Sequence, residues 1–111
     1  MILVDTSVWI DHLRAKDDGL TRLLTLGQVL VHPFVVGEIA LGNLANRDVV
    51  LSALGRLAQA QVATDQEVQH LITANQLFGT GIGYIDAHLL ASARLSTGAL
   101  LWAGLALRRW R

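Results

Sequence analysis

Three of the nine acidic residues lie where solvation alone does not readily account for a charge. Asp5 follows the apolar run Ile2–Val4. Glu38 and Asp86 each have only apolar residues and glycine three and four positions away on either side. On a helix those positions share one face, and a carboxylate there is costly unless a partner compensates its charge. These three side chains are therefore the first candidates for chemistry.

Each of the three carboxylates also has a purely structural interpretation. Asp5 could cap the N-terminus of a helix, Glu38 could cover a helix edge, and Asp86 could cap the first turn of its helix. The remaining carboxylates lie in turns, first helical turns or helix ends, where solvent and the helix dipole explain them. These are Asp11, Asp17, Asp18, Asp48, Asp65 and Glu67.

The elements that would hold these carboxylates follow from the hydrophobic pattern. Short apolar, β-branched runs predict strands at Ile2–Val4, Val29–Val31 and Ala99–Trp102. Helices are expected from Val8, around Leu20–Leu24, from Pro33 to about Asn43, after a cap at Asn46, after the capping box Thr64–Glu67, and over Tyr84–Leu95. The helix after Asn46 is expected to turn inward Val49, Val50, Ala53, Leu54 and Leu57.

Strands that alternate with helices predict an α/β fold with a short parallel sheet flanked by helices. In such a sheet the strand ends and the following helix starts lie at one edge, so the three carboxylates should converge there. Each close pair would repel by about 4 kcal/mol at an effective dielectric constant near 20. A divalent cation would remove that cost. Oxygen ligands in a chain without cysteine favour Mg²⁺ or Mn²⁺ over Zn²⁺.

The histidines do not add to this metal site. None of the four is spaced from another histidine or an acid as helical metal ligands are, and His88 lies on the opposite side of its helix from Asp86. We therefore expect structural roles for His12, His32, His70 and His88.

Length and composition limit the possible classes of protein. The 111 residues suffice for one domain, residues 1–111, and 52% apolar content with 16% charged residues excludes a disordered chain. The formal net charge of zero gives no general attraction to nucleic acid. The longest apolar stretch, Ala99–Leu107, is about half a membrane span. The lack of cysteine and of a basic leader fits a cytoplasmic protein, and the high mean hydropathy of +0.43 predicts a homodimer or another partner chain.

Three segments together resemble the PIN-domain family. They are the opening Met1–Ile10, with Asp5-Thr6-Ser7, then Glu38–Gly42, and Gly83–Ala93 with Asp86. Their order and spacing match from Met1 to about Trp102, and the compact size is most similar to the VapC toxins of bacterial toxin–antitoxin pairs. The resemblance implies a PIN-like three-layer fold and a metal-dependent endoribonuclease that cleaves RNA. It also implies a partner antitoxin and a dimer, with Asp5, Glu38 and Asp86 as catalytic metal ligands. Thr6 or Ser7 would orient Asp5 or a water on the ion.

The C-terminal part departs from the family pattern. A fourth acid usually follows the last parallel strand, whereas this chain has Ala103, Gly104 and Leu105 after Trp102. The usual last helix and strand are shortened to Ala106–Arg111. Two explanations stay open: a shortened member with a weakened site, or a frameshifted reading frame.

Two rival functions follow from these observations. One is a degenerate PIN domain that binds RNA or an antitoxin with little catalysis. The other is a receiver-like signalling domain, which would need an acidic pair at the first strand and a lysine at a late strand end. Lys16 is the only lysine of the chain, which disfavours the receiver-like domain.

Overall fold

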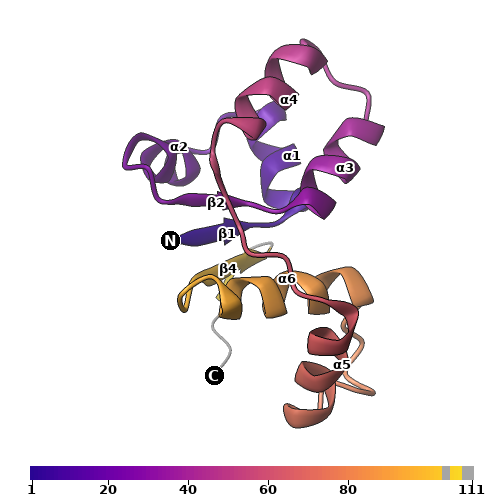
Figure 1. Ribbon diagram of the computed structural model, residues 1–111. Coiled ribbons are helices and arrows are strands. Elements are labelled where there is room, and N and C mark those ends of the chain that lie inside the picture. The colour runs from indigo at the N-terminus through magenta and orange to yellow at the C-terminus, as the bar shows by residue number, and fades with distance from the viewer. Residues whose placement is uncertain (104–105, 109–111) are drawn as a thin grey trace.

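The chain forms a five-stranded sheet with helices on both faces (Figure 1). The computed structural model describes residues 1–103 and the backbone of residues 106–108. The strands are β1 (Ile2–Val4), β2 (Val29–Val31), β3 (Ala58–Gln59), β4 (Leu100–Ala103) and β5 (Ala106–Arg108). The helices are α1 (Thr6–Arg14), α2 (Asp18–Thr25), α3 (Pro33–Leu41), α4 (Arg47–Gly55), α5 (Asp65–Ala74) and α6 (Tyr84–Leu95).

The strand order β3-β2-β1-β4-β5 determines which helices cover which face. The first four strands in this order run parallel, and β5 pairs antiparallel with β4. Because parallel crossovers are right-handed, connections that lead from β1 through β2 to β3 place α1–α4 on one face. The return from β3 to β4 places α5 and α6 on the other, and Figure 1 shows these two groups on either side of the strands. The predicted α/β architecture is confirmed.

Two short strands were not predicted. β3 consists of an alanine and a glutamine, and neither residue favours a strand by its own propensity. Its pairing with β2, Leu30 opposite Ala58 and Val31 opposite Gln59, is what extends the sheet. β5 falls in the part of the chain that was expected to hold a shortened helix and strand. The prediction that concerns Gly104 and Leu105 lies outside the described residues.

Side chains cap α1, α2, α3 and α5, whereas α4 and α6 have no side-chain cap. Thr64 and Glu67 form the predicted capping box of α5, in which each side chain accepts a hydrogen bond from the other residue's backbone N–H. Asn46 lies at the predicted start of α4, but its backbone is left-handed with φ 55° and its side chain makes no capping hydrogen bond. The prediction that the Asn46 side chain caps this helix is therefore wrong, although the helix does start after Asn46.

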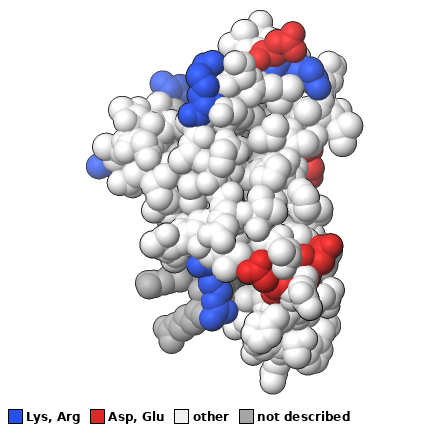
Figure 2. All heavy atoms as spheres, in the orientation of Figure 1, with Lys and Arg blue, Asp and Glu red and all other residues white. Residues whose placement is uncertain are grey.

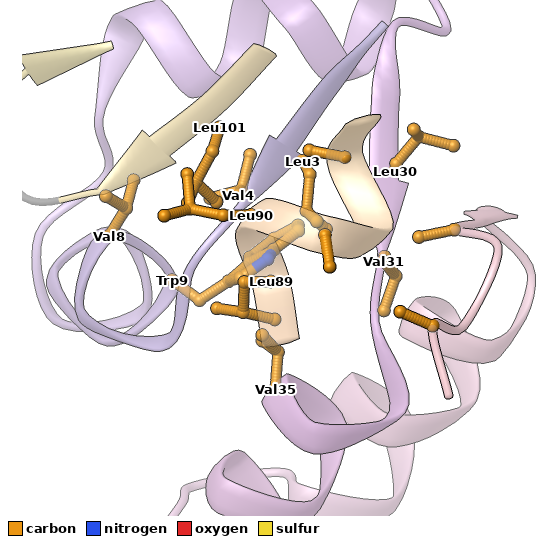
Figure 3. Close-up of a cluster of buried hydrophobic side chains, with 14 of the residues drawn as sticks. Leu3, Val4, Val8, Trp9, Leu30, Val31, Val35, Leu89, Leu90 and Leu101 are labelled. Carbon is orange, nitrogen blue, oxygen red and sulfur yellow. The ribbon is translucent and has the colours of Figure 1, made fainter. Parts of the chain in front are cut away.

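The hydrophobic core lies on both faces of the sheet (Figure 3). Leu3 and Val4 of β1 pack with Trp9 of α1 and Leu89 of α6, which places β1 at the centre of the molecule. In α4, Leu54 is buried as predicted, whereas Val49 is 69% exposed and does not face inward.

The surface has few charges. On the face drawn in Figure 2, small separate groups of basic and acidic side chains interrupt a largely uncharged surface. Within the described residues, no helix combines the length and hydrophobicity that a membrane span requires.

Candidate functional site

A cleft of about 290 Å³ lies at the edge of the sheet where β1 and β4 end. Two of the three predicted carboxylates, Asp5 and Asp86, line it together. Its other lining residues come from β4, from the body of α6 and from the glycine-rich loop before α6; they are Thr80, Gly81, Ile82, Leu90, Leu101 and Ala103. The topology therefore brings together two acids that are 81 positions apart in the sequence.

Asp5 caps α1 while it lines the cleft. Its Oδ1 accepts hydrogen bonds from the Val8 backbone N–H at 3.2 Å and from the Ser7 hydroxyl at 2.9 Å. Both bonds use the same carboxylate oxygen, Oδ1, and they orient the carboxylate group. The structural interpretation of Asp5 as a helix cap is thus correct, and it is compatible with a role in the site. The Ser7 hydroxyl thus contacts Asp5, and its role in orienting a metal ligand stays a prediction.

Asp86 belongs to the first turn of α6. The backbone N–H groups at this helix start favour a negative charge. The N-cap residue of α6 is Gly83, so no side chain caps the helix. The Asp86 carboxylate is thus the acidic group in the first turn of a helix that no side chain caps.

Glu38, the third predicted acid, contacts Thr6. The Thr6 hydroxyl donates a hydrogen bond of 3.3 Å to Glu38 Oε1, and Thr6 is the residue that follows Asp5. Thr6 thus contacts Glu38, whereas the sequence had suggested Asp5 or a bound water. Glu38 is not among the residues that line the cleft with Asp5 and Asp86.

The side chains of Glu38 and Asp86 are exposed, which corrects the expectation that both acids would lie on buried apolar faces. Apolar neighbours three and four positions away therefore do not bury either carboxylate. Within the described residues, no group of three His, Cys, Asp or Glu side chains is close enough to hold a metal ion. The cleft itself offers two carboxylates and no histidine or cysteine, a donor set that suits a hard cation.

Sequence reasoning missed one polar contact near the site. Asp65 in the first turn of α5 accepts hydrogen bonds from Tyr84 and His88 on α6, at 2.9 Å each. Its neighbours in the sequence had suggested only solvation. A larger hollow of about 780 Å³ lies between α5 and α6 and contains none of the three predicted acids.

Comparisons with known proteins identify the family of this chain. The sequence profile of the PIN domain matches residues 2–110. Ribonuclease VapC32 from Mycobacterium tuberculosis, found in strains CDC 1551 / Oshkosh and ATCC 25618 / H37Rv, is 51% identical over 102 residues, which cover 92% of this chain and 82% of the relative. A solved structure described as "Structure of FitAB bound to IR36 DNA fragment" superposes with a TM-score of 0.60 at 20% identity, over 91% of this chain and 82% of the other.

The chain therefore belongs to the PIN-domain family, as its sequence motifs predicted. Within that family its similarity is to the VapC type. The solved structure supports the fold alone, since its sequence identity is low. The receiver-like alternative is excluded by the family match.

Proposed function

We propose that this protein is a metal-dependent endoribonuclease and the toxin component of a type II toxin–antitoxin pair. The observation that carries the proposal is the cleft in which Asp5 and Asp86 face the same space at the strand ends. The similarity to a ribonuclease of the VapC type supports the choice of RNA as substrate. Such an enzyme would act in the cytoplasm, where its RNA substrate is found.

Asp5 and Asp86 would hold the cation in the cleft, and we take it to be Mg²⁺ or Mn²⁺. Glu38, which does not line the cleft, is the third ligand that the family resemblance implies. Divalent-metal dependence is typical of this family, and the oxygen-only donors of the cleft fit these ions. When bound, the cation supplies Lewis-acid stabilisation of the phosphate under attack and eases ionisation of the attacking water. Ser7 and the Val8 N–H keep Asp5 oriented, and Thr6 keeps Glu38 beside α1.

The partners we propose are an antitoxin protein and a second copy of the chain. Exposed apolar side chains support both: Leu41 is 90% and Phe78 67% exposed. The family pairs its toxins with antitoxins, and an apolar segment of such a protein would cover surfaces of this kind.

We further propose that cleavage is slow compared with that of four-acid relatives. Leu105, or Gly104 when the position is counted from Asp86, stands where the family has its fourth acid, so the site would have one negative charge fewer. Loss of one electrostatic stabiliser of a transition state commonly costs on the order of 10²–10³ in rate. In the degenerate alternative the cleavage rate would be lower still, and the protein would bind RNA or an antitoxin with little catalysis. A single-turnover assay in which Leu105→Asp accelerates cleavage would support it, and wild-type rates equal to those of four-acid relatives would contradict it.

The central test compares wild type with Asp86→Asn. We expect wild type to arrest growth after induced expression and to cleave RNA only when Mg²⁺ or Mn²⁺ is present. Asp86→Asn should abolish both effects with little change in stability, since the side chain is exposed.

A matched control is available in Asp48→Asn. Asp48 is also an exposed acid in the first turn of a helix, α4, but it does not line the cleft. Equal loss of cleavage in both variants, or metal-independent cleavage by wild type, would contradict the proposal.

A further inference from the structure

The start of α6, which carries Asp86, is anchored from outside the helix. No side chain caps it, and the loop before it contains Gly79 and Gly81, both with positive φ. A helix start of this kind leaves its first N–H groups without side-chain partners and tends to fray. The place of the Asp86 carboxylate in the cleft therefore depends on contacts made by its neighbours on α6.

Asp65 supplies two of those contacts. Its Oδ1 accepts a hydrogen bond from the Tyr84 hydroxyl and another from His88 Nε2–H, each 2.9 Å long. Tyr84 lies two residues before Asp86 and His88 two residues after it. A single carboxylate on α5 thus holds α6 on both sides of Asp86. The two donors lower the pKa of Asp65, His88 more than Tyr84, so Asp65 is a carboxylate that acts as an acceptor at neutral pH.

The His88 ring is fixed on its other sides as well. It is only 4% exposed and packs edge to face against Tyr84 and Phe34, with ring centroids 4.9 Å apart in each pair. Phe34 belongs to α3, the helix that bears Glu38. These ring contacts restrict the motion of the His88 side chain. Its hydrogen bond to Asp65 therefore restrains α6 relative to α5.

Asp65 belongs to the first turn of α5, and its contacts to α6 are made by its own side chain. Asp65 remains largely exposed and lines neither of the two hollows. It therefore has no contact with the cleft, and any effect on the chemistry must pass through Tyr84 and His88.

We propose that Asp65 is a positioning residue for the active site: through Tyr84 and His88 it fixes the first turn of α6 and thereby the place of the Asp86 carboxylate opposite Asp5. The inference rests on the proposed function, since it concerns the same site. It assigns to an exposed surface acid a role that its exposure alone would not suggest. Residues that orient metal ligands commonly change metal affinity or activity 10–100-fold when they are replaced.

The test measures Mn²⁺ binding by calorimetry and RNA cleavage for wild type, Asp65→Ala and Tyr84→Phe. We expect Asp65→Ala to weaken Mn²⁺ binding about tenfold and to lower kcat about tenfold, with KM for RNA little changed. Tyr84→Phe removes one of the two bonds and keeps the ring against His88, so its effect should be smaller and in the same direction. It also keeps the test valid if Asp65→Ala folds poorly.

The matched control is Glu67→Ala. It opens the capping box and destabilises the same turn of α5, but leaves Asp65 with both of its α6 partners. We expect it to lower the melting temperature while Mn²⁺ affinity and kcat stay at the wild-type values. Asp65→Asn keeps an acceptor oxygen without the charge and should recover part of the activity lost in Asp65→Ala.

The outcomes separate this inference from the proposed function. Wild-type Mn²⁺ affinity and kcat in both Asp65→Ala and Tyr84→Phe would overturn the positioning role alone. A loss in Glu67→Ala equal to that in Asp65→Ala would also overturn it, because general destabilisation would then suffice. A wild-type protein that neither binds Mn²⁺ nor cleaves RNA would overturn the proposed function and this inference with it.

Discussion

His32 shows how one buried side chain couples folding to pH. Its Nδ1 accepts a hydrogen bond from the Phe34 backbone N–H and so caps α3. The proton of the neutral ring is therefore on Nε2, and this N–H donates a hydrogen bond of 3.0 Å to Ser92 Oγ. The bond from Phe34 requires the neutral ring, because a protonated Nδ1 could no longer accept it. Burial, and to a lesser degree the nearby His88, lowers the pKa of His32 from its usual 6.5 to about 4.

We expect the free energy of unfolding to fall as the pH drops from about 6.5 to about 4. In this window the unfolded chain protonates His32 and the folded chain does not, so the contribution is fully present above the unfolded pKa and lost on acidification. The loss could reach roughly 3 kcal/mol. Urea unfolding at a series of pH values measures it.

The control for this pH effect is His32→Asn. Asparagine can still cap α3 but does not titrate. The part of the slope due to His32 should vanish in this variant, whatever its absolute stability. An unchanged slope between pH 4 and 6.5 would show that another group is responsible.

At the scale of the elements, the starts of α4 and α5 lead to opposite predictions for the loss of their N-cap residues. Thr64→Ala should lower the free energy of unfolding by about 1 kcal/mol, because it removes a cap that accepts the Glu67 N–H. Asn46→Gly should be neutral or stabilising, because Asn46 makes no cap and has a left-handed backbone that glycine adopts readily. Chemical denaturation of the two variants compares them directly; equal losses would refute the assignment.

The sequence predicts those parts of the fold that local pattern determines. The bounds of α6 and the capping box of α5 could be predicted because periodicity and capping residues lie within one or two helical turns. β3 could not, since a two-residue strand exists only through its pairing with β2. The candidate site also has one part that the sequence predicts and one part that depends on contacts between distant residues. Asp5 and Asp86 were predicted from their place in the topology, whereas the bond between Asp65 and His88 joins residues 23 positions apart and leaves no local pattern.

At the scale of the whole molecule, apolar side chains left in solvent predict association. Leu41 at the end of α3 and Val49 in α4 are 90% and 69% exposed, on two helices that pack together. We expect wild type to be a dimer, or to form a stable complex with its antitoxin, by light scattering. Replacement of both residues by serine should weaken that association at least tenfold.

Leu26→Ser is the comparison for this experiment. Leu26 is also exposed, at 58%, but follows α2 at the other end of this helical layer. A monomeric wild type with no affinity for an antitoxin, or equal effects of Leu26→Ser and the double variant, would contradict the prediction.

The bonds that Asp5 makes at the start of α1 bear on how this protein can change over evolutionary time. Position 5 serves the folded state as a helix cap and, under the proposed function, would also serve the chemistry, while positions 38 and 86 hold exposed side chains. A lineage that abandons cleavage but keeps its partner should therefore drift freely at 38 and 86. At 5 it should drift mainly to Asn, Ser or Thr, which preserve a capping oxygen. A library at the three positions, sorted for protein abundance instead of toxicity, would reveal this asymmetry; equal tolerance at all three would refute it.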